Sequence, residues 1–254
     1  LSMQGHDQYY ENVAGRKFVR KSREHFPATP WGAMGIKVFD YDNDGRLDVY
    51  VTDMHTDMVD VVTHQVRHWY AEKEKMAQNY PERLLAYDGN HILGNAFFRN
   101  DGDGKFSEIS DENGTETYWP WGLSTGDLNA DGWEDIFVIN SMNFPFRYTP
   151  NSVLLNDHGK FRNSEFIVGV EPRSGGLTRW WFEVDCDTQA DYSTMTGNVC
   201  KGRTGKVVVH SALGSRSSVI FDVDGDGDLD IVTNDFNTEP MVLISDLSEQ
   251  KAIK

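Results

Sequence analysis

Short runs of apolar residues alternate along this chain with loops rich in Asp and Gly. Three of the runs contain Val and Ile and follow directly on an acidic loop: LDVYVTD at 47–53, EDIFVIN at 134–140 and LDIVTND at 229–235. They are too short for helices, and their β-branched and aromatic residues favour strands. An apolar run also precedes each loop, at 31–39, 121–126 and 217–221. The pattern therefore predicts a strand, an acidic loop and a second strand, three times over.

A second pattern, an apolar run followed by Asn, a Gly turn and Phe, lies between these units. It occurs as QYYENVAGRKF at 8–18, AFFRNDGDGKF at 96–106 and SVLLNDHGKF at 152–161, with a degenerate copy, PMVLISDLSE, at 240–249. Gly-containing turns between apolar runs indicate tight β-hairpins. The chain is thus predicted to contain a leading half-unit and three full units of two hairpins each.

Two hairpins in fixed order, four strands per unit, are typical of the blades of a β-propeller. We therefore predict an all-β fold in which residues 1–254 form a single β-propeller region of four-stranded antiparallel blades. Because a propeller closes with about four to eight blades, this number of units predicts a partial propeller or a fragment. A β-sandwich is the alternative, but it would not require the same loop in every repeat.

Insertions must lengthen the repeat, because its acidic loops begin at Asp40, Asp127 and Asp222, farther apart than the roughly 40–50 residues of a bare blade. The predicted insertions lie near 54–92, 107–118 and 171–212. The first has apolar residues at helical spacing, which predicts one helical insertion packed on the propeller. Its His64 and His68 are one helical turn apart and could share a transition metal. Alternatively, they only border the apolar face of the helix.

The charge of the chain excludes some partners. Its 40 acidic and 24 basic residues give a formal net charge of −16, which argues against nucleic acid and anionic lipid and favours cations. No apolar run approaches the roughly 18 residues of a membrane-spanning helix, so membrane insertion is not expected.

Two cysteines, Cys186 and Cys200, lie in a polar stretch. Neither sits in an apolar run, so we predict a disulfide rather than two buried thiols. A disulfide indicates an oxidising compartment, and we expect a secreted, cell-surface or periplasmic protein.

The acidic loops have the residue pattern of calcium sites. Carboxylates or amides occupy positions 1, 3, 5 and 9, Gly at position 6 allows the loop to fold back, and position 7 can offer its carbonyl. Oxygen ligands alone suit Ca²⁺, whereas Zn²⁺ would require His or Cys and Mg²⁺ would keep more water. The predicted ligands of three Ca²⁺ ions are Asp40, Asp42, Asp44, Arg46 (carbonyl) and Asp48; Asp127, Asn129, Asp131, Trp133 (carbonyl) and Asp135; and Asp222, Asp224, Asp226, Asp228 (carbonyl) and Asp230.

The alternative is a set of solvated Asp-Gly turns without metal, which three matches at equivalent places in a repeat make a poor explanation. By contrast, DGDG at 101–104 lacks the ninth-position carboxylate and is predicted to be a plain hairpin turn.

DxDxDGxxD between strands, followed by a hairpin of the form LLNDxGKF, resembles the FG-GAP/VCBS repeats of calcium-binding β-propellers, including integrin α-subunit heads. More narrowly, GIKVFDYDNDGRLDVYVTDMH (35–55) and FDVDGDGDLDIVTNDFNTEPMVLISD (221–246) resemble the cartilage acidic protein (ASPIC/UnbV) family. The resemblance implies a calcium-binding propeller, secreted or surface-exposed, that is typically followed by a small ASPIC/UnbV domain.

We therefore expect an extracellular, calcium-stabilised module that binds an unidentified protein or glycan, or assembles with itself, without catalysis of its own. The sequence contains no nucleophile elbow and no phosphate-binding Gly loop. Two alternatives remain: a propeller-fold enzyme such as a polysaccharide lyase, with catalytic residues in the insertions, and a structural filament subunit.

Overall fold

The computed structural model describes residues 6–30, 32–54, 91–92, 94–140, 149–173, 180–188, 199–210, 213–236 and 238–247. Within them the fold is all-β, with short helices such as α1 (Ser22–His25) and α4 (Ser110–Asn113). The predicted helical insertion, with His64 and His68, lies outside the described residues.

Two four-stranded antiparallel sheets form the centre of the structure. The strands of the first blade, in sheet order, are β4 (Ala33–Phe39), β5 (Asp48–Asp53), β7 (Ala96–Gly102) and β8 (Lys105–Glu108). Those of the second blade are β9 (Pro120–Gly126), β10 (Asp135–Asn140), β11 (Ser152–Asp157) and β12 (Lys160–Asn163). In both, the strands add in chain order, as the two sequence patterns predict.

Incomplete blades flank this pair. On one side is the hairpin of β1 (Tyr10–Val13) and β2 (Lys17–Arg20). On the other is the third blade, with β15 (Ser215–Phe221), β16 (Asp230–Asp235) and β17 (Met241–Leu243). The degenerate copy at 240–249 was expected to supply a whole half-unit, but its described residues form one strand, β17. It lacks the Gly turn that closes the other hairpins.

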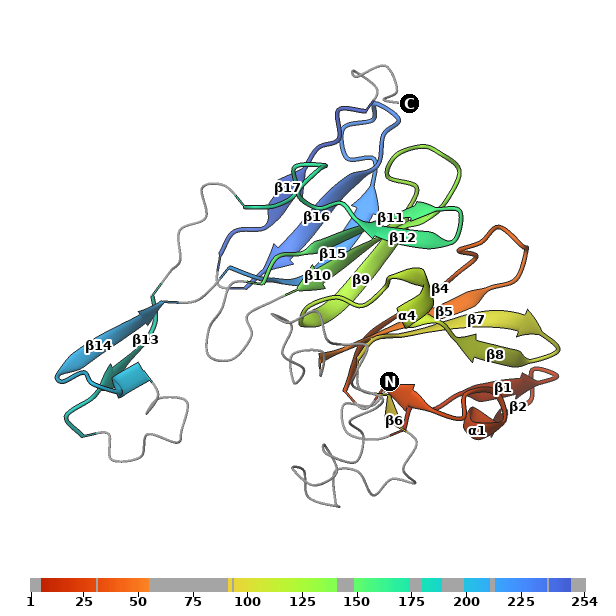
Figure 1. Cartoon of the computed structure of the whole chain (residues 1–254), viewed down its shortest axis with the longest axis horizontal. Coiled ribbons are helices and arrows are strands. Elements are labelled where there is room, and N and C mark those ends of the chain that lie inside the picture. The colour runs from red at the N-terminus through yellow and green to blue at the C-terminus, as the bar shows by residue number, and fades with distance from the viewer. Residues whose placement is uncertain are drawn as a thin grey trace.

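The blades pack face to face, and their first strands lie side by side, with β9 between β4 and β15 (Figure 1). The backbones of β4 and β9 come very close. A Cβ atom added at Gly35 would lie 2.8 Å from the Cα of Gly122, so a glycine is required there. The result is a fan of blades, which confirms an all-β, partial propeller-like fold.

Strand β10 is buried on both faces. On one face Ile136 packs with Tyr50 in the cluster between the first and second blades. On the other, Phe137 packs with Ile231 in the cluster between the second and third blades. Burial on both sides explains why EDIFVIN is a continuous apolar run rather than an alternating one.

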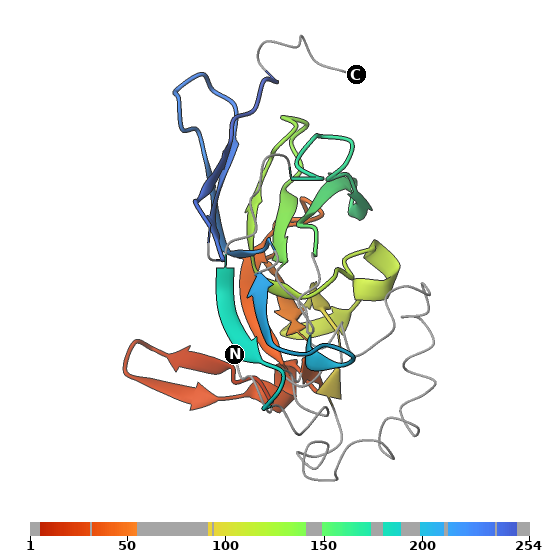
Figure 2. The ribbon, with the colours of Figure 1, turned by 90° about the vertical axis from the view of Figure 1, so that its left-hand side faces the viewer.

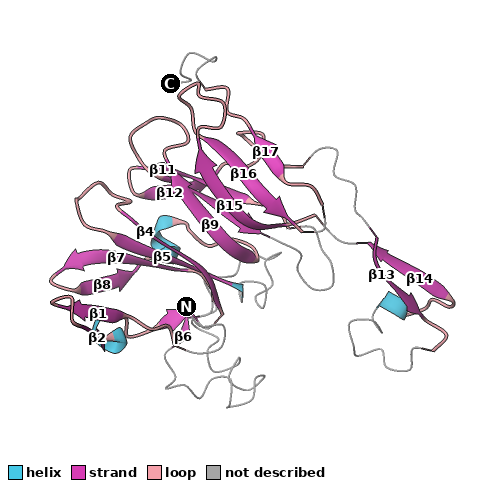
Figure 3. Ribbon diagram, turned by 180° about the vertical axis from the view of Figure 1, so that it is seen from behind, coloured by secondary structure: helices cyan, strands magenta, loops and turns pink. Residues whose placement is uncertain are grey.

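Two smaller pairs of strands complete the described fold. Strand β3 (Thr29–Pro30) pairs in parallel with β6 (His91–Ile92). Strands β13 (Trp180–Asp185) and β14 (Lys206–His210) form an antiparallel hairpin that stands to one side of the blades in Figures 1 and 3 and in front of them in Figure 2.

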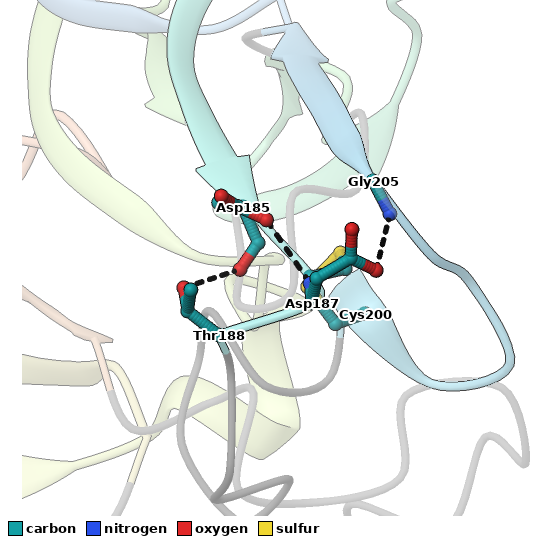
Figure 4. The surroundings of a disulfide bond; sticks show 6 residues. Asp185, Asp187, Thr188, Cys200 and Gly205 are labelled. Atoms are coloured by element: carbon teal, nitrogen blue, oxygen red, sulfur yellow. Dashed lines mark hydrogen bonds between the residues drawn. A yellow bond between two sulfur atoms is a disulfide. The ribbon is translucent and has the colours of Figure 1, made fainter.

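A disulfide joins the two ends of this hairpin's turn region. Cys186 and Cys200 are bonded, with an S–S distance of 2.03 Å and a Cα–Cα distance of 5.2 Å, which confirms the predicted pair. Beside it, Asp187 accepts a hydrogen bond from the N–H of Gly205 at 2.8 Å (Figure 4). The sequence pattern did not predict this hairpin, because residues 171–212 were interpreted only as an insertion.

Candidate metal centre

The three acidic loops occupy equivalent places in the three blades. Each joins the first two strands of its blade: residues 40–47 link β4 to β5, residues 127–134 link β9 to β10, and residues 222–229 link β15 to β16 (Figure 1). The repeat therefore places three groups of carboxylates in equivalent structural surroundings.

The carboxylate at position 1 folds each loop back on itself. Asp40 accepts hydrogen bonds from the N–H groups of Asp44 at 3.1 Å and Gly45 at 2.9 Å. Asp127 accepts the equivalent pair at 3.0 and 2.8 Å. In the third loop, Asp222 bonds the N–H of Gly227 at 3.0 Å. The glycines at position 6 have φ values of +83°, +90° and +99°, the left-handed conformation that glycine adopts without strain.

The carboxylate at position 9 is almost completely buried: Asp48, Asp135 and Asp230 are at most 1% exposed. One oxygen of Asp135 accepts the N–H of Leu128 in its own loop at 2.8 Å, and the other accepts the N–H of Asn156 in the third strand at 2.8 Å. Asp48 makes the same two kinds of bond, and Asp230 bonds its own loop and the N–H of Ser245, just beyond the third strand of its blade. This carboxylate therefore ties the loop to the blade, a role that the sequence did not predict.

Burial raises the pKa of Asp48 to about 6 and that of Asp135 to about 7, although the backbone N–H groups that both accept oppose the shift. Removal of these carboxylates from water thus has a free-energy cost that a cation would offset.

In two of the loops three carboxylates converge. Oxygens of Asp40, Asp42 and Asp48 lie within 4.8 Å of one another, as do those of Asp222, Asp224 and Asp226. Ligands of one Ca²⁺ lie about 2.3–2.6 Å from it, so two of them are at most about 5 Å apart. Both clusters therefore could bind a metal ion.

The side chain of Asp42 gives the clearest indication that the first acidic loop suits a metal ion. Its Oδ1 atom is buried and has no hydrogen-bond partner among the residues that the structure describes. Burial raises the pKa of this carboxyl, and the nearby charges of Asp44 and Asp40 raise it further. A buried carboxylate oxygen without such a partner, on a residue that belongs to a group of converging carboxylates, is an environment that a hard cation satisfies.

Not all of the predicted calcium ligands of each loop come together in the structure. Asp44 lies outside the first converging group and forms an ion pair with Arg46, and Asp230 lies outside the third group. In the second loop, the amide of Asn129 hydrogen-bonds to Asp131, its Nδ2 donating to Oδ2 at 2.9 Å. The carbonyls of Arg46, Trp133 and Asp228 remain predicted ligands.

The DGDG segment is a hairpin turn between β7 and β8, as predicted. Asp101 is bonded to Arg99 at 2.9 Å and to Ser107, so this carboxylate is already satisfied by protein groups. It therefore differs from the carboxylate of Asp42 in the first acidic loop, whose Oδ1 atom has no hydrogen-bond partner among the described residues.

A family model described as the FG-GAP-like repeat matches residues 1–51 and 79–138, which contain the first two acidic loops. The match covers less than half of the chain, and it supports an FG-GAP relationship for this part. Together with the sheets, it supports the class of a β-propeller-like module with FG-GAP-like repeats in the matched residues. No curated protein matches the chain. Within the described residues, no helix is long and apolar enough to cross a membrane.

Proposed function

We propose that this chain is an extracellular, calcium-stabilised module that binds a protein or glycan partner and has no catalytic activity of its own. The observation that carries the proposal is the orphan oxygen of Asp42, which lies in a group of converging carboxylates at the start of a thrice-repeated loop. FG-GAP repeats are compatible with a binding role.

In each loop the ion would be held by the residues at positions 1, 3, 5 and 9 and the carbonyl at position 7. Calcium would supply positive charge that offsets carboxylate repulsion, and three ions would bring the formal net charge from −16 to −10. Because all the predicted ligands of an ion come from one loop, the ion would stabilise the loop rather than contact a substrate.

The location is part of the proposal. The Cys186–Cys200 disulfide supports an oxidising compartment, and we propose a secreted, cell-surface or periplasmic protein. The narrower resemblance to the ASPIC/UnbV family fits the same setting.

Calorimetric titration of the chelated protein with Ca²⁺ tests the metal sites. We expect three ions per chain, a large rise in melting temperature, and poor replacement by Mg²⁺, which demands a smaller octahedral site. Asp42→Asn keeps the size of the side chain but removes its charge, and it should reduce the stoichiometry to two.

Asp103→Asn is the matched control, because Asp103 has a φ of +51°, which Asn tolerates, and it lies in the β7–β8 turn outside the acidic loops. It should leave three ions bound. A protein that shows no Ca²⁺ binding, or an Asp42→Asn variant that still binds three ions, would contradict the proposal.

A further inference from the structure

One face of the first blade is apolar and only partly covered. This face, here called the N-face, is directed away from the second blade and carries Ile36, Val38, Val49, Val51, Phe98 and Phe106. Over its outer strands, Phe26 packs edge-on against Phe98 and at a tilt against Phe106, with ring centroids 5.1 and 4.6 Å apart. Over its first strand, Ile36 is 48% and Val38 is 53% exposed. The outer half of the N-face is therefore covered, and the inner half is open.

A comparison of equivalent positions in the first and second blades shows what kind of surface the open half of the N-face is suited to contact. Counted from the first Asp of each acidic loop, Ile36 in the first blade corresponds to Leu123 in the second, and Val49 corresponds to Ile136. Leu123 and Ile136 are 9% and 0% exposed, because the first blade packs against them. The N-face thus carries apolar side chains at the positions that, one blade later, bind the preceding blade.

In the part of the chain that the structure describes, the β1–β2 hairpin beside the N-face lacks an inner strand pair of the kind that the complete blades have. The β1–β2 hairpin has the same sequence pattern as β7–β8 and β11–β12, the outer pairs of complete blades. Among the described strands, β1 pairs with β2 alone, so its other edge carries no strand. Next to it is a cavity of about 300 Å³, lined by the N-face together with residues 7–9, Phe26, Thr29 and Leu47.

We propose that the N-face is a docking surface for the inner strand pair of a further blade of this same repeat, two antiparallel strands joined by an acidic loop. One strand pairs with the free edge of β1, and alternate apolar side chains cover Ile36 and Val38 and fill the cavity. This inference does not depend on whether the acidic loops bind calcium.

A fusion tests the proposal with the complete chain. Residues 215–235, the β15–β16 pair with its loop, are placed ahead of residue 1. This pair is chosen because Val219 and Phe221, 48% and 45% exposed, stand at the repeat positions that face a following blade. Residues 1–9 then link the inner to the outer pair, as residues 141–151 do in the second blade.

We expect the fusion to melt several degrees higher than the chain alone, and amide exchange in β1 to slow by at least about tenfold. The matched control fusion carries Ser at the added copies of Val219 and Phe221 and should give neither effect. A second variant, Val38→Glu, should cancel the gain in the fusion and leave the unfused chain unchanged, because Val38 is exposed there.

The proposal would be overturned if the fusion and its Ser control slowed amide exchange in β1 equally, or if neither slowed it. Sedimentation of the unfused chain tests the other occupant, a second copy. We expect no association that Val38→Glu abolishes; a dimer that this variant dissociates would show that a second copy covers the N-face, and it too would overturn the proposal.

Discussion

Glu116 is a partly buried residue whose carboxylate has no cationic partner among the described residues. Its Oε2 atom accepts the N–H of Asn95 at 3.2 Å, just before the third strand of the first blade. The buried amide of Asn95 in turn donates to the Tyr50 hydroxyl at 3.0 Å and to Thr117 at 2.9 Å. Glu116 therefore supports a polar network in the middle of the blade.

The second blade has the same arrangement with a cation added. Glu171 accepts the N–H of Asn151 at 2.8 Å, and Arg173 lies 3.4 Å from its carboxylate. Two residues after Glu116 the chain has Tyr118 instead of an arginine. Burial consequently raises the pKa of Glu116 to about 8, and the charges of Asp111 and Glu108 add to the shift.

Glu116→Gln should therefore stabilise the protein at high pH. The ordinary pKa of the group is 4.5, so between pH 4.5 and about 8 the folded protein retains a proton that the unfolded chain has released. The contribution of Glu116 to the free energy of unfolding is most favourable below pH 4.5 and falls as the pH rises to about 8. At 1.36 kcal/mol per pKa unit, the total loss is roughly 5 kcal/mol at most.

Denaturant unfolding of the two proteins at several pH values measures this effect. Near pH 4.5 we expect wild type and Glu116→Gln to differ little, and at pH 9 we expect the variant to be more stable by several kcal/mol. Glu112→Gln, which removes an exposed carboxylate close in the sequence, is the control for the loss of one charge. A difference between wild type and Glu116→Gln that stays constant from pH 4.5 to 9 would refute the reasoning.

Two further outcomes are expected. Thiol titration of the denatured, unreduced protein should find no free thiol, since Cys186 and Cys200 are bonded; two thiols per chain would contradict this and the assignment to an oxidising compartment. Asn156→Ala should weaken Ca²⁺ binding at the first and second loops, because its Nδ2 donates to carbonyls in both, at Tyr41 and next to Asp135. Asn100→Ala removes a hydrogen bond to the first loop alone and should weaken Ca²⁺ binding only there. Equal weakening at the first and second loops by Asn100→Ala would contradict this expectation.

The sequence alone determined the repeat unit of this protein. The acidic loops and the hairpin turns could be predicted because their causes are local: a Gly at position 6 and carboxylates at alternate positions act within nine residues. The apolar runs predicted strands for the same reason. The disulfide was also predictable, because two cysteines allow one intramolecular pair.

Tertiary structure alone decided which groups each carboxylate meets. Asp48, Asp135 and Asp230 look like further ligands in the sequence, but their oxygens also bond the third strand or, for Asp230, the segment just after it, up to 52 residues away. The orphan oxygen of Asp42 and the pairing of Asp44 with Arg46 depend equally on how the loop closes.

The same holds for blade contacts. Both faces of β10 are apolar in the sequence, and one face of β4 carries Ile36 and Val38, yet β10 is buried while Ile36 and Val38 are exposed. A pattern of apolar residues specifies which side chains gain by leaving water. Whether they do so depends on a neighbouring sheet, and the position of that sheet is a property of the folded chain.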